Sequence, residues 1–262
     1  MLSNEDIIYT AMHQSALDIG ADAEDFLDSK NIMVKFQLGS FARKYYREPI
    51  SCTMVSYGNN IVAATKPEYT DLIRDYINAH DFYHCFETPT MHLLDEQLLP
   101  LGQRVCFMAE YFLPDTRCMQ RLSCPYELKV LTQPDFQSLY LPQWSNALCE
   151  QRKELDVLGV GAYDNGQLIG LAACSADCNT MWQIGVDVLP EYRQRGVAAA
   201  LTSNLAFEIL NRDKVPFYCC AWSNIRSAKN AIKSGFRPAW VEMTVKPISV
   251  VNALNHPKQS CI

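Results

Sequence analysis

A short turn in the second half of the chain has the features that bind a phosphate group. The hexapeptide Arg193–Ala198 reads RQRGVA and lies between a predicted strand at 182–188 and a predicted helix at 198–211. No Ser, Thr, Asp or Asn stands where this helix begins, so its first N–H groups lack a side-chain cap. An anion can accept those hydrogen bonds at the positive end of the helix dipole, and Gly196 lets the backbone approach it closely. The pattern predicts a phosphate-binding turn, with capping by water as the alternative.

The elements around this turn can be read from hydrophobic periodicity and turn residues. Asn165-Gly166 is a strong hairpin signal between two apolar runs. Gly235 follows the last predicted helix, where a left-handed cap costs little. The predicted strands are 127–131, 157–163, 167–175, 182–188, 217–222 and 239–245, and the predicted helices are 198–211 and 225–234, with a helical region between 134 and 150.

The first half of the chain is predicted to be a separate α+β domain. Its pattern indicates a helix at 4–18, a hairpin at Gly58–Asn60, a helix at 67–79 and a strand at 104–112. The polar stretch 113–125 contains two prolines and is the best linker candidate. We therefore expect an N-terminal domain at 1–120 and a second domain at 121–262.

Two motifs of the second domain resemble the GNAT superfamily of N-acetyltransferases. The hexapeptide at 193–198 matches the pyrophosphate-binding pattern Arg/Gln-x-x-Gly-x-Gly/Ala, and a strand ending in Val188–Pro190 precedes it. The second signature follows in order as Asn224–Ser227, with Gly235-Phe236 after the next helix. The whole chain looks like two-part bacterial GNAT acetyltransferases. The resemblance implies an α+β fold whose C-terminal GNAT part has a mixed, mostly antiparallel central sheet flanked by helices.

The resemblance also implies acetyl-CoA as co-substrate. In GNAT proteins two neighbouring parallel strands splay apart, and the pantetheine arm lies in the gap like a short extra strand. The valines of the strand can equally be plain core, and Asn224 is about as well explained as a helix cap. The residues implied for acetyl-CoA are Val186, Val188, Arg193, Gln194, Arg195, Gly196, Val197, Ala198 and Asn224.

The resemblance leaves the acid and base of the reaction open. Many family members have a tyrosine acid seven residues after the asparagine, and this sequence has Ala231 there. The candidate catalytic residues are Asp187 as base, unless strand alternation turns it away from the pocket, and Ser227 near the pantetheine arm. We expect direct transfer of the acetyl group to a primary amine in a ternary complex. The alternative, kept open by Ala231, is a catalytically silent module that binds acyl-CoA.

Composition limits the remaining partners. A net charge of −6 and a pI near 5.4 argue against a general nucleic-acid binder. No apolar run is long enough to span a bilayer and the start lacks a secretory signal, so we expect a cytoplasmic protein without a membrane partner. His80, His84 and Cys85 lack a matching second pair, so no metal is expected. The expected acceptor is a small amine or a peptide, and a homodimer stays open.

Overall fold

The computed structural model describes residues 2–47 and 49–255, and it divides the chain into two compact units. Unit 1 contains Met1–Ala11 and Tyr111–Ala239, and unit 2 contains Met12–Glu110 and Trp240–Ile262. These bounds differ from a single split at residue 120. Unit 1 includes the N-terminal residues of the chain, and unit 2 includes the C-terminal residues. Three elements run through the unit boundaries, namely α1 (Asn4–Ile19), β4 (Gln103–Pro114) and β10 (Phe236–Pro247). The expected domains 1–120 and 121–262 stay a prediction.

Unit 1 is built on a mixed sheet with the strand order β4-β9-β8-β7-β6-β5. Strands β5 to β8 pair antiparallel in sequence order, and β8 pairs parallel with β9. Positive φ angles at Asn165 (47°) and Gly166 (83°) form the tight β6–β7 turn, which confirms that predicted hairpin. The strands after β4 are β5 (Glu127–Thr132), β6 (Asp156–Asp164), β7 (Gln167–Ser175), β8 (Met181–Val188) and β9 (Val215–Cys220).

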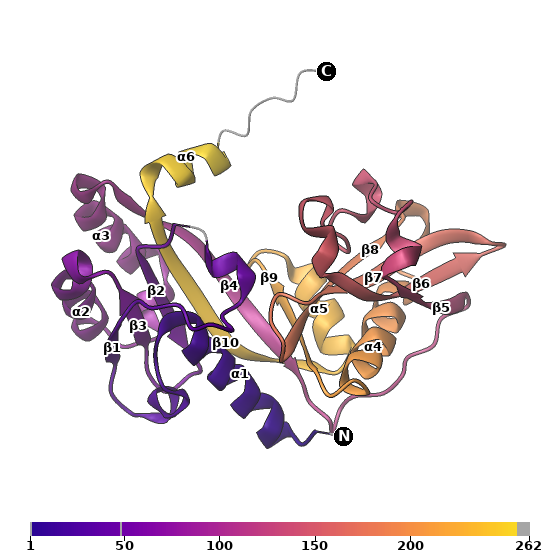
Figure 1. The fold of residues 1–262 in the computed structure, drawn as a ribbon, viewed down its shortest axis with the longest axis horizontal. Helices are drawn as coiled ribbons and strands as arrows, with labels where there is room; N and C mark the ends of the chain where they lie inside the picture. The colour runs from indigo at the N-terminus through magenta and orange to yellow at the C-terminus, as the bar shows by residue number, and fades with distance from the viewer. Residues whose placement is uncertain (1, 48, 256–262) are drawn as a thin grey trace. The chain divides into compact units, whose positions relative to one another are not determined.

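Two helices belong to this sheet, α4 (Val197–Leu210) and α5 (Ile225–Lys233). Helix α4 packs on β6, β7 and β8, and Figure 1 shows it beside those strands. The predicted apolar stripe Leu201, Leu205 and Ile209 is fully buried in the core that these elements share. The mixed sheet flanked by helices is the fold that the sequence predicts for this part of the chain.

The segment between β5 and β6 differs from its prediction. Instead of one helical region, it forms three short 3₁₀ turns at Gln133–Phe136, Pro142–Trp144 and Glu150–Leu155. Prolines near the start of the first two turns cannot donate to a longer helical ladder. The segment is held by a small core instead, in which Phe136, Trp144 and Leu148 pack with two residues of β7. Burial of aromatic side chains therefore replaces regular helix as the source of order here.

Unit 2 is a second α+β unit with the strand order β1-β3-β2-β10-β4. Strand β1 pairs parallel with β3, and β2 pairs antiparallel with both β3 and β10. The β2–β3 hairpin turns at Gly58 (φ 98°), as predicted. The other elements are β1 (Ile32–Lys35), β2 (Cys52–Ser56), β3 (Val62–Thr65), α2 (Thr70–Ala79), α3 (Thr88–Leu98) and α6 (Ile248–Asn255). Within residues 2–47 and 49–255, no helix combines the length and apolar character that a membrane span requires.

Candidate functional site

A cleft of about 850 Å³ opens in unit 1 beside the predicted phosphate-binding turn. Its lining comes from β8 from Gln183 onward, the turn before α4, the first turn of α4, the end of β9, the start and one face of α5, and Asn146 of the segment before β6. All but one of the implied acetyl-CoA residues line it, the exception being Arg195. The structure thus brings together residues that lie up to 38 positions apart, from Val186 to Asn224.

The cleft follows a fork between two parallel strands. Strands β8 and β9 pair at three positions, from Met181–Val215 to Gln183–Phe217, and then separate. Strand β8 continues to Val188 and β9 to Cys220, so both strands run on beyond their last register pair on either side of the gap. An extended ligand can bind such edges as a short additional strand. This is the splayed pair of strands that the resemblance implies.

The two predicted valines of β8 lie both at the core and at the cleft. The side chains of Val186 and Val188 pack against the core under α4, and both residues also line the cleft. The core role of both side chains is therefore confirmed, and a main-chain contact with a ligand stays a prediction.

The turn before α4 exposes main-chain donors, as predicted. Gln194 (φ 63°) and Gly196 (φ 82°) both have left-handed backbone, and α4 begins at Val197 without a side-chain cap. A Cβ atom built at Gly196 would meet no atom within 4 Å, so the turn faces open space. The first N–H groups of a helix in this situation form an anion site. The structure therefore places Gln194, Gly196, Val197 and Ala198 around a place suited to phosphate.

The two arginines of the turn have different positions. Arg193 lines the cleft, and its Nε donates to the carbonyl oxygen of Val188 at 3.0 Å. Arg195 does not line it, because its Nη1 donates to the Tyr126 hydroxyl at 2.9 Å and its guanidinium lies 5.5 Å from the Tyr192 ring centroid. Arg193 is thus placed for direct contact, whereas Arg195 adds positive potential from outside the lining.

Three cations on α5 line the same cleft, and the sequence interpretation missed them. Arg226, Lys229 and Lys233 are exposed and lie at positions i, i+3 and i+7, which is one face of a helix. That spacing on the predicted helix 225–234 was a usable signal. With Arg193 they make the rim cationic in a chain of net charge −6, and such a rim favours an anionic ligand.

Asp187 lines the cleft, but its carboxylate is engaged by the segment before β6. Its Oδ2 accepts from the backbone N–H groups of Asn146 (2.8 Å) and Ala147 (2.9 Å), and its Oδ1 accepts from Asn146 Nδ2 (2.6 Å). The same segment lies on Gly185, where a Cβ atom would come within 1.9 Å of the Asn146 carbonyl oxygen. The geometry gives Asp187 the role of a tether, and its role as base stays a prediction without support from these contacts.

The second motif caps α5 and carries a hydroxyl pair. Asn224 Oδ1 accepts from the Ser227 N–H at 3.2 Å, which is the N-cap interaction considered for it, and both residues line the cleft. Ser227 Oγ lies 2.7 Å from the hydroxyl of Tyr218, whose pKa is raised by burial, with the Ser227 hydrogen bond opposing that rise. Ala231 is buried in the same core as Tyr218. Ser227 therefore lies at the cleft in contact with a buried phenol.

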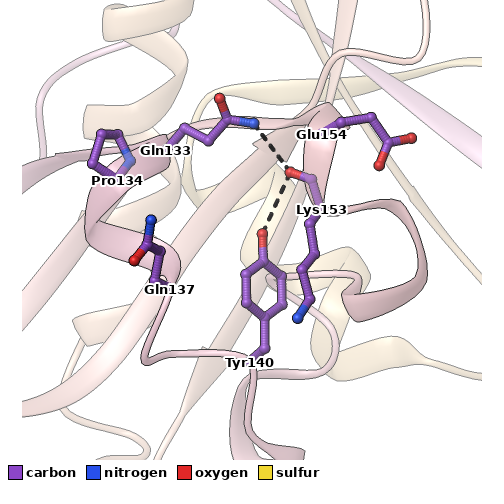
Figure 2. Close-up of a pocket in the computed structure, with 6 residues that line it drawn as sticks. All are labelled: Gln133, Pro134, Gln137, Tyr140, Lys153 and Glu154. Carbon is purple, nitrogen blue, oxygen red and sulfur yellow. Dashed lines mark hydrogen bonds between the residues drawn. The ribbon is translucent and has the colours of Figure 1, made fainter.

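A second hollow of about 300 Å³ lies elsewhere on unit 1 and lacks these features (Figure 2). Gln133 Nε2 and the Tyr140 hydroxyl both donate to the carbonyl oxygen of Lys153, at 3.3 and 3.4 Å. The Lys153 ammonium lies 4.5 Å from the Tyr140 ring centroid. The described residues that line this hollow form neither a strand fork nor an uncapped helix start, so we place the functional site in the larger cleft. Among the described residues, no group of three His, Cys, Asp or Glu side chains could hold a metal ion.

Comparison with known proteins identifies the family. A family model described as GNAT acetyltransferase matches residues 100–239, which is more than half of the 262 residues. The chain belongs to the GNAT acetyltransferase family. The GNAT match begins ahead of β4, so the family domain includes that strand. No curated protein matches the chain.

Solved structures with a similar fold include several acetyltransferases. A GNAT family acetyltransferase from Novosphingobium aromaticivorans is 21% identical over 55% of this chain and 66% of its own, with a TM-score of 0.41. A GCN5-related N-acetyltransferase-like protein from Streptococcus suis is 19% identical over 77% of this chain and 85% of its own, with a TM-score of 0.46. The aminoglycoside N-acetyltransferase AAC(6')-Iy, solved in complex with CoA, is 19% identical over 46% of this chain and 93% of its own, with a TM-score of 0.35.

Proposed function

We propose that this GNAT chain binds acetyl-CoA in the cleft of unit 1 and transfers the acetyl group to a primary amine. The observation that carries the proposal is one cleft with three features, namely the β8–β9 fork, the uncapped start of α4 and the cationic rim. Each matches a different part of the co-substrate, in order along its length. The acceptor we expect is a small amine or a peptide.

The diphosphate would bind at the turn before α4. The N–H groups of Gln194–Ala198 are the available donors, and Arg193 adds a guanidinium that can form charge-assisted hydrogen bonds. The exposed cations of α5 line the same cleft, where they can attract further phosphate charge. This local excess of positive charge contrasts with the net charge of −6 of the whole chain.

The pantetheine arm would follow β8 from this turn toward the fork. Main-chain groups of Val186–Val188 can bond to its amides and to the thioester carbonyl, as donors held in place before the reaction. The amine would then attack the carbonyl carbon directly, with no acyl-enzyme. Positioning both reactants in one cleft accounts for much of the expected acceleration. Asp187 would contribute by holding the 146–147 backbone against β8.

A thermal-melt titration of the full chain with acetyl-CoA tests the proposal without knowledge of the acceptor. A ligand present at 100 times its dissociation constant stabilises the folded state by about 2.7 kcal/mol. We expect a dose-dependent rise in Tm that exceeds the rise given by adenosine 3′,5′-bisphosphate, which lacks the pantetheine arm. Absence of a shift at saturating acetyl-CoA would refute the binding half of the proposal.

Release of CoA in the presence of primary amines tests the transfer half. A chain that binds acetyl-CoA tightly but forms no CoA or acetylated amine would be the silent binding module. Buried Ala231, in place of the tyrosine that many GNAT members carry, is the observation that keeps this second function in view.

A further inference from the structure

Three of the described residues that line the cleft carry hydroxyl groups, Tyr192, Tyr218 and Ser227. The Tyr192 hydroxyl donates to the carboxylate of Asp164 at 3.0 Å, so its proton is directed away from the cleft. The hydroxyls of Tyr218 and Ser227 instead lie 2.7 Å from each other. This pair, one phenol from β9 and one alcohol from α5, is the candidate proton donor within the cleft.

Tyr218 stands at the fork. Phe217 is the last residue of β9 that pairs with β8, and Tyr218 is the next residue along the strand. The gap is closed at this end and opens toward the turn before α4. A ligand arm that follows β8 from Val188 back to Ile184 covers about 13 Å at about 3.3 Å per residue and ends beside the fork. The reactive end of the arm therefore comes to the phenol, and its phosphates stay at the turn.

Cleavage of a thioester at this place creates a charge that needs a proton. Breaking the carbon–sulfur bond leaves the electron pair on sulfur, and a thiolate in a half-buried gap lacks the hydration that stabilises it in water. The cations of α5 do not meet this need well, because Arg226, Lys229 and Lys233 are exposed at the rim. Tyr218 is only 4% exposed.

We propose that Tyr218 donates its phenolic proton to the sulfur of the departing CoA and that Ser227 orients this phenol. The inference rests on the proposed acetyl transfer in the same cleft. The amine nitrogen forms a bond to the carbonyl carbon, the carbon–sulfur bond breaks toward sulfur, and the tyrosine proton moves to that sulfur. Ser227 donates to the resulting phenolate oxygen, and the proton lost by the amine returns to Tyr218 through solvent. Free amine and thioester thus become amide and thiol with no net change in protons.

The surroundings of Tyr218 suit this role. Burial raises the pKa of its phenol, so the group carries its proton at neutral pH. Loss of hydration in the gap makes the nascent thiolate more basic as well, so the proton can move to sulfur as the carbon–sulfur bond breaks. Ser227 is half-buried on the first turn of α5, where its backbone N–H is fixed by the Asn224 cap. Tyr218 is the acid in this scheme, and Ser227 is a positioning residue that acts through it.

The experiment compares Tyr218→Phe, Ser227→Ala and Ser227→Thr with the full wild-type chain. Phenylalanine keeps the ring in the core and removes only the hydroxyl, so folding should survive. Formation of CoA from acetyl-CoA is followed by chromatography with water, spermidine and a lysine-containing peptide as acceptors, and acetyl-CoA binding is followed by the shift in Tm. Tyr140→Phe, in the separate hollow of Figure 2, is the matched control.

We expect Tyr218→Phe to lower kcat about 100-fold, the lower range for a general acid, with KM and the acetyl-CoA-induced Tm shift unchanged. Ser227→Ala should lower kcat less, Ser227→Thr should restore it, and Tyr140→Phe should match wild type. Equal kcat in Tyr218→Phe and wild type would overturn the inference while the proposed function stands. A wild-type chain that binds acetyl-CoA but forms no CoA would refute the transfer half of the proposed function, and the inference would fall with it. No Tm shift in wild type would refute the binding half, with the same consequence for the inference.

Discussion

Among the described residues that line the cleft, Asp187 is the one carboxylate, and its two oxygens accept three hydrogen bonds from Asn146 and Ala147. Alternation along β8 could predict which side of the sheet it faces but not what covers that side. The covering segment has no regular pattern, because it is organised by buried aromatic residues rather than by helical spacing. From the sequence, a carboxylate in this strand suggested a catalytic base. Its hydrogen bonds in the structure instead indicate a structural tether.

Replacement of Asp187 by Asn separates these two roles. If the amide oxygen of asparagine accepts from both backbone N–H groups, its NH₂ faces Asn146 Nδ2, which is also a donor, so the charged acceptor and one hydrogen bond are lost. We expect the free energy of unfolding to fall by about 1–3 kcal/mol, measured by urea titration, while acetyl-CoA still raises Tm. Asp213→Asn, at an exposed turn position, should unfold like wild type. Unchanged stability together with lost CoA formation would instead return Asp187 to the role of base.

Unit 2 contains a buried ionic cluster that makes its stability depend on pH. Arg43 donates through Nε to Asp18, and its Nη2 lies 3.8 Å from Glu242 Oε2, with all three side chains at most 2% exposed. Burial raises the pKa of Glu242 to about 7, although Arg43 opposes the rise. The folded state therefore holds a proton that the unfolded state releases above about pH 4.5. The contribution of the Glu242 carboxyl group to the free energy of unfolding is therefore full below about pH 4.5, and it is lost as the pH rises through about 7.

The variant Glu242→Gln tests this dependence. Because glutamine cannot ionise, the midpoint of urea unfolding should fall less between pH 5 and pH 7.5 in the variant than in wild type. Glu96→Gln, on an exposed face of α3, should keep the wild-type dependence. Equal loss of stability in wild type and Glu242→Gln across this range would show that Glu242 does not carry the effect.

At the scale of elements, the start of α4 depends on one backbone conformation. Gly196 has φ 82° and open space around its Cα, and Gly166 in the β6–β7 turn has φ 83° and open space as well. Aspartate at either position costs about the same backbone strain, but only at Gly196 does it place a carboxylate among the phosphate donors. We expect Gly196→Asp to abolish the acetyl-CoA-induced rise in Tm and Gly166→Asp to keep it. Loss of the rise in both variants would mean that strain, not the phosphate site, explains the effect.

The elements that the sequence predicted well are those with strong local signals. The Asn165-Gly166 hairpin, the apolar stripe of α4 and the uncapped turn at Gly196 each follow from residue types and spacings within a short stretch of sequence. The 133–155 segment was predicted poorly, because proline and long-range aromatic packing compete there with helix formation. The Tyr218–Ser227 pair could not be predicted, because it depends on the register at which β9 leaves β8 and on the cap of α5.

At the scale of the whole molecule, each unit consists of two separate segments of the chain, whereas two consecutive domains would have one segment each. Strand β4 contributes Tyr111, Phe112 and Leu113 to unit 1, each at most 5% exposed, and Phe112 lies in the core beneath α4. Just after it, the Asp115 N–H donates to the carbonyl oxygen of Gly235 at 2.9 Å. The polar stretch that predicted a linker therefore begins inside a strand that the GNAT fold needs.

This arrangement predicts that a fragment of residues 121–262 does not fold, whereas residues 100–239, the range of the family match, do. Removing one buried phenylalanine typically costs 3–5 kcal/mol, and the shorter fragment loses Phe112, its buried neighbours and a strand from a total stability of about 5–15 kcal/mol. Circular dichroism during urea titration should show a cooperative transition for 100–239 only. If 121–262 unfolds cooperatively and gains Tm with acetyl-CoA, β4 is dispensable and the boundary at residue 120 is the true one. Cooperative unfolding of 100–239 alone would show that the GNAT domain extends back through β4.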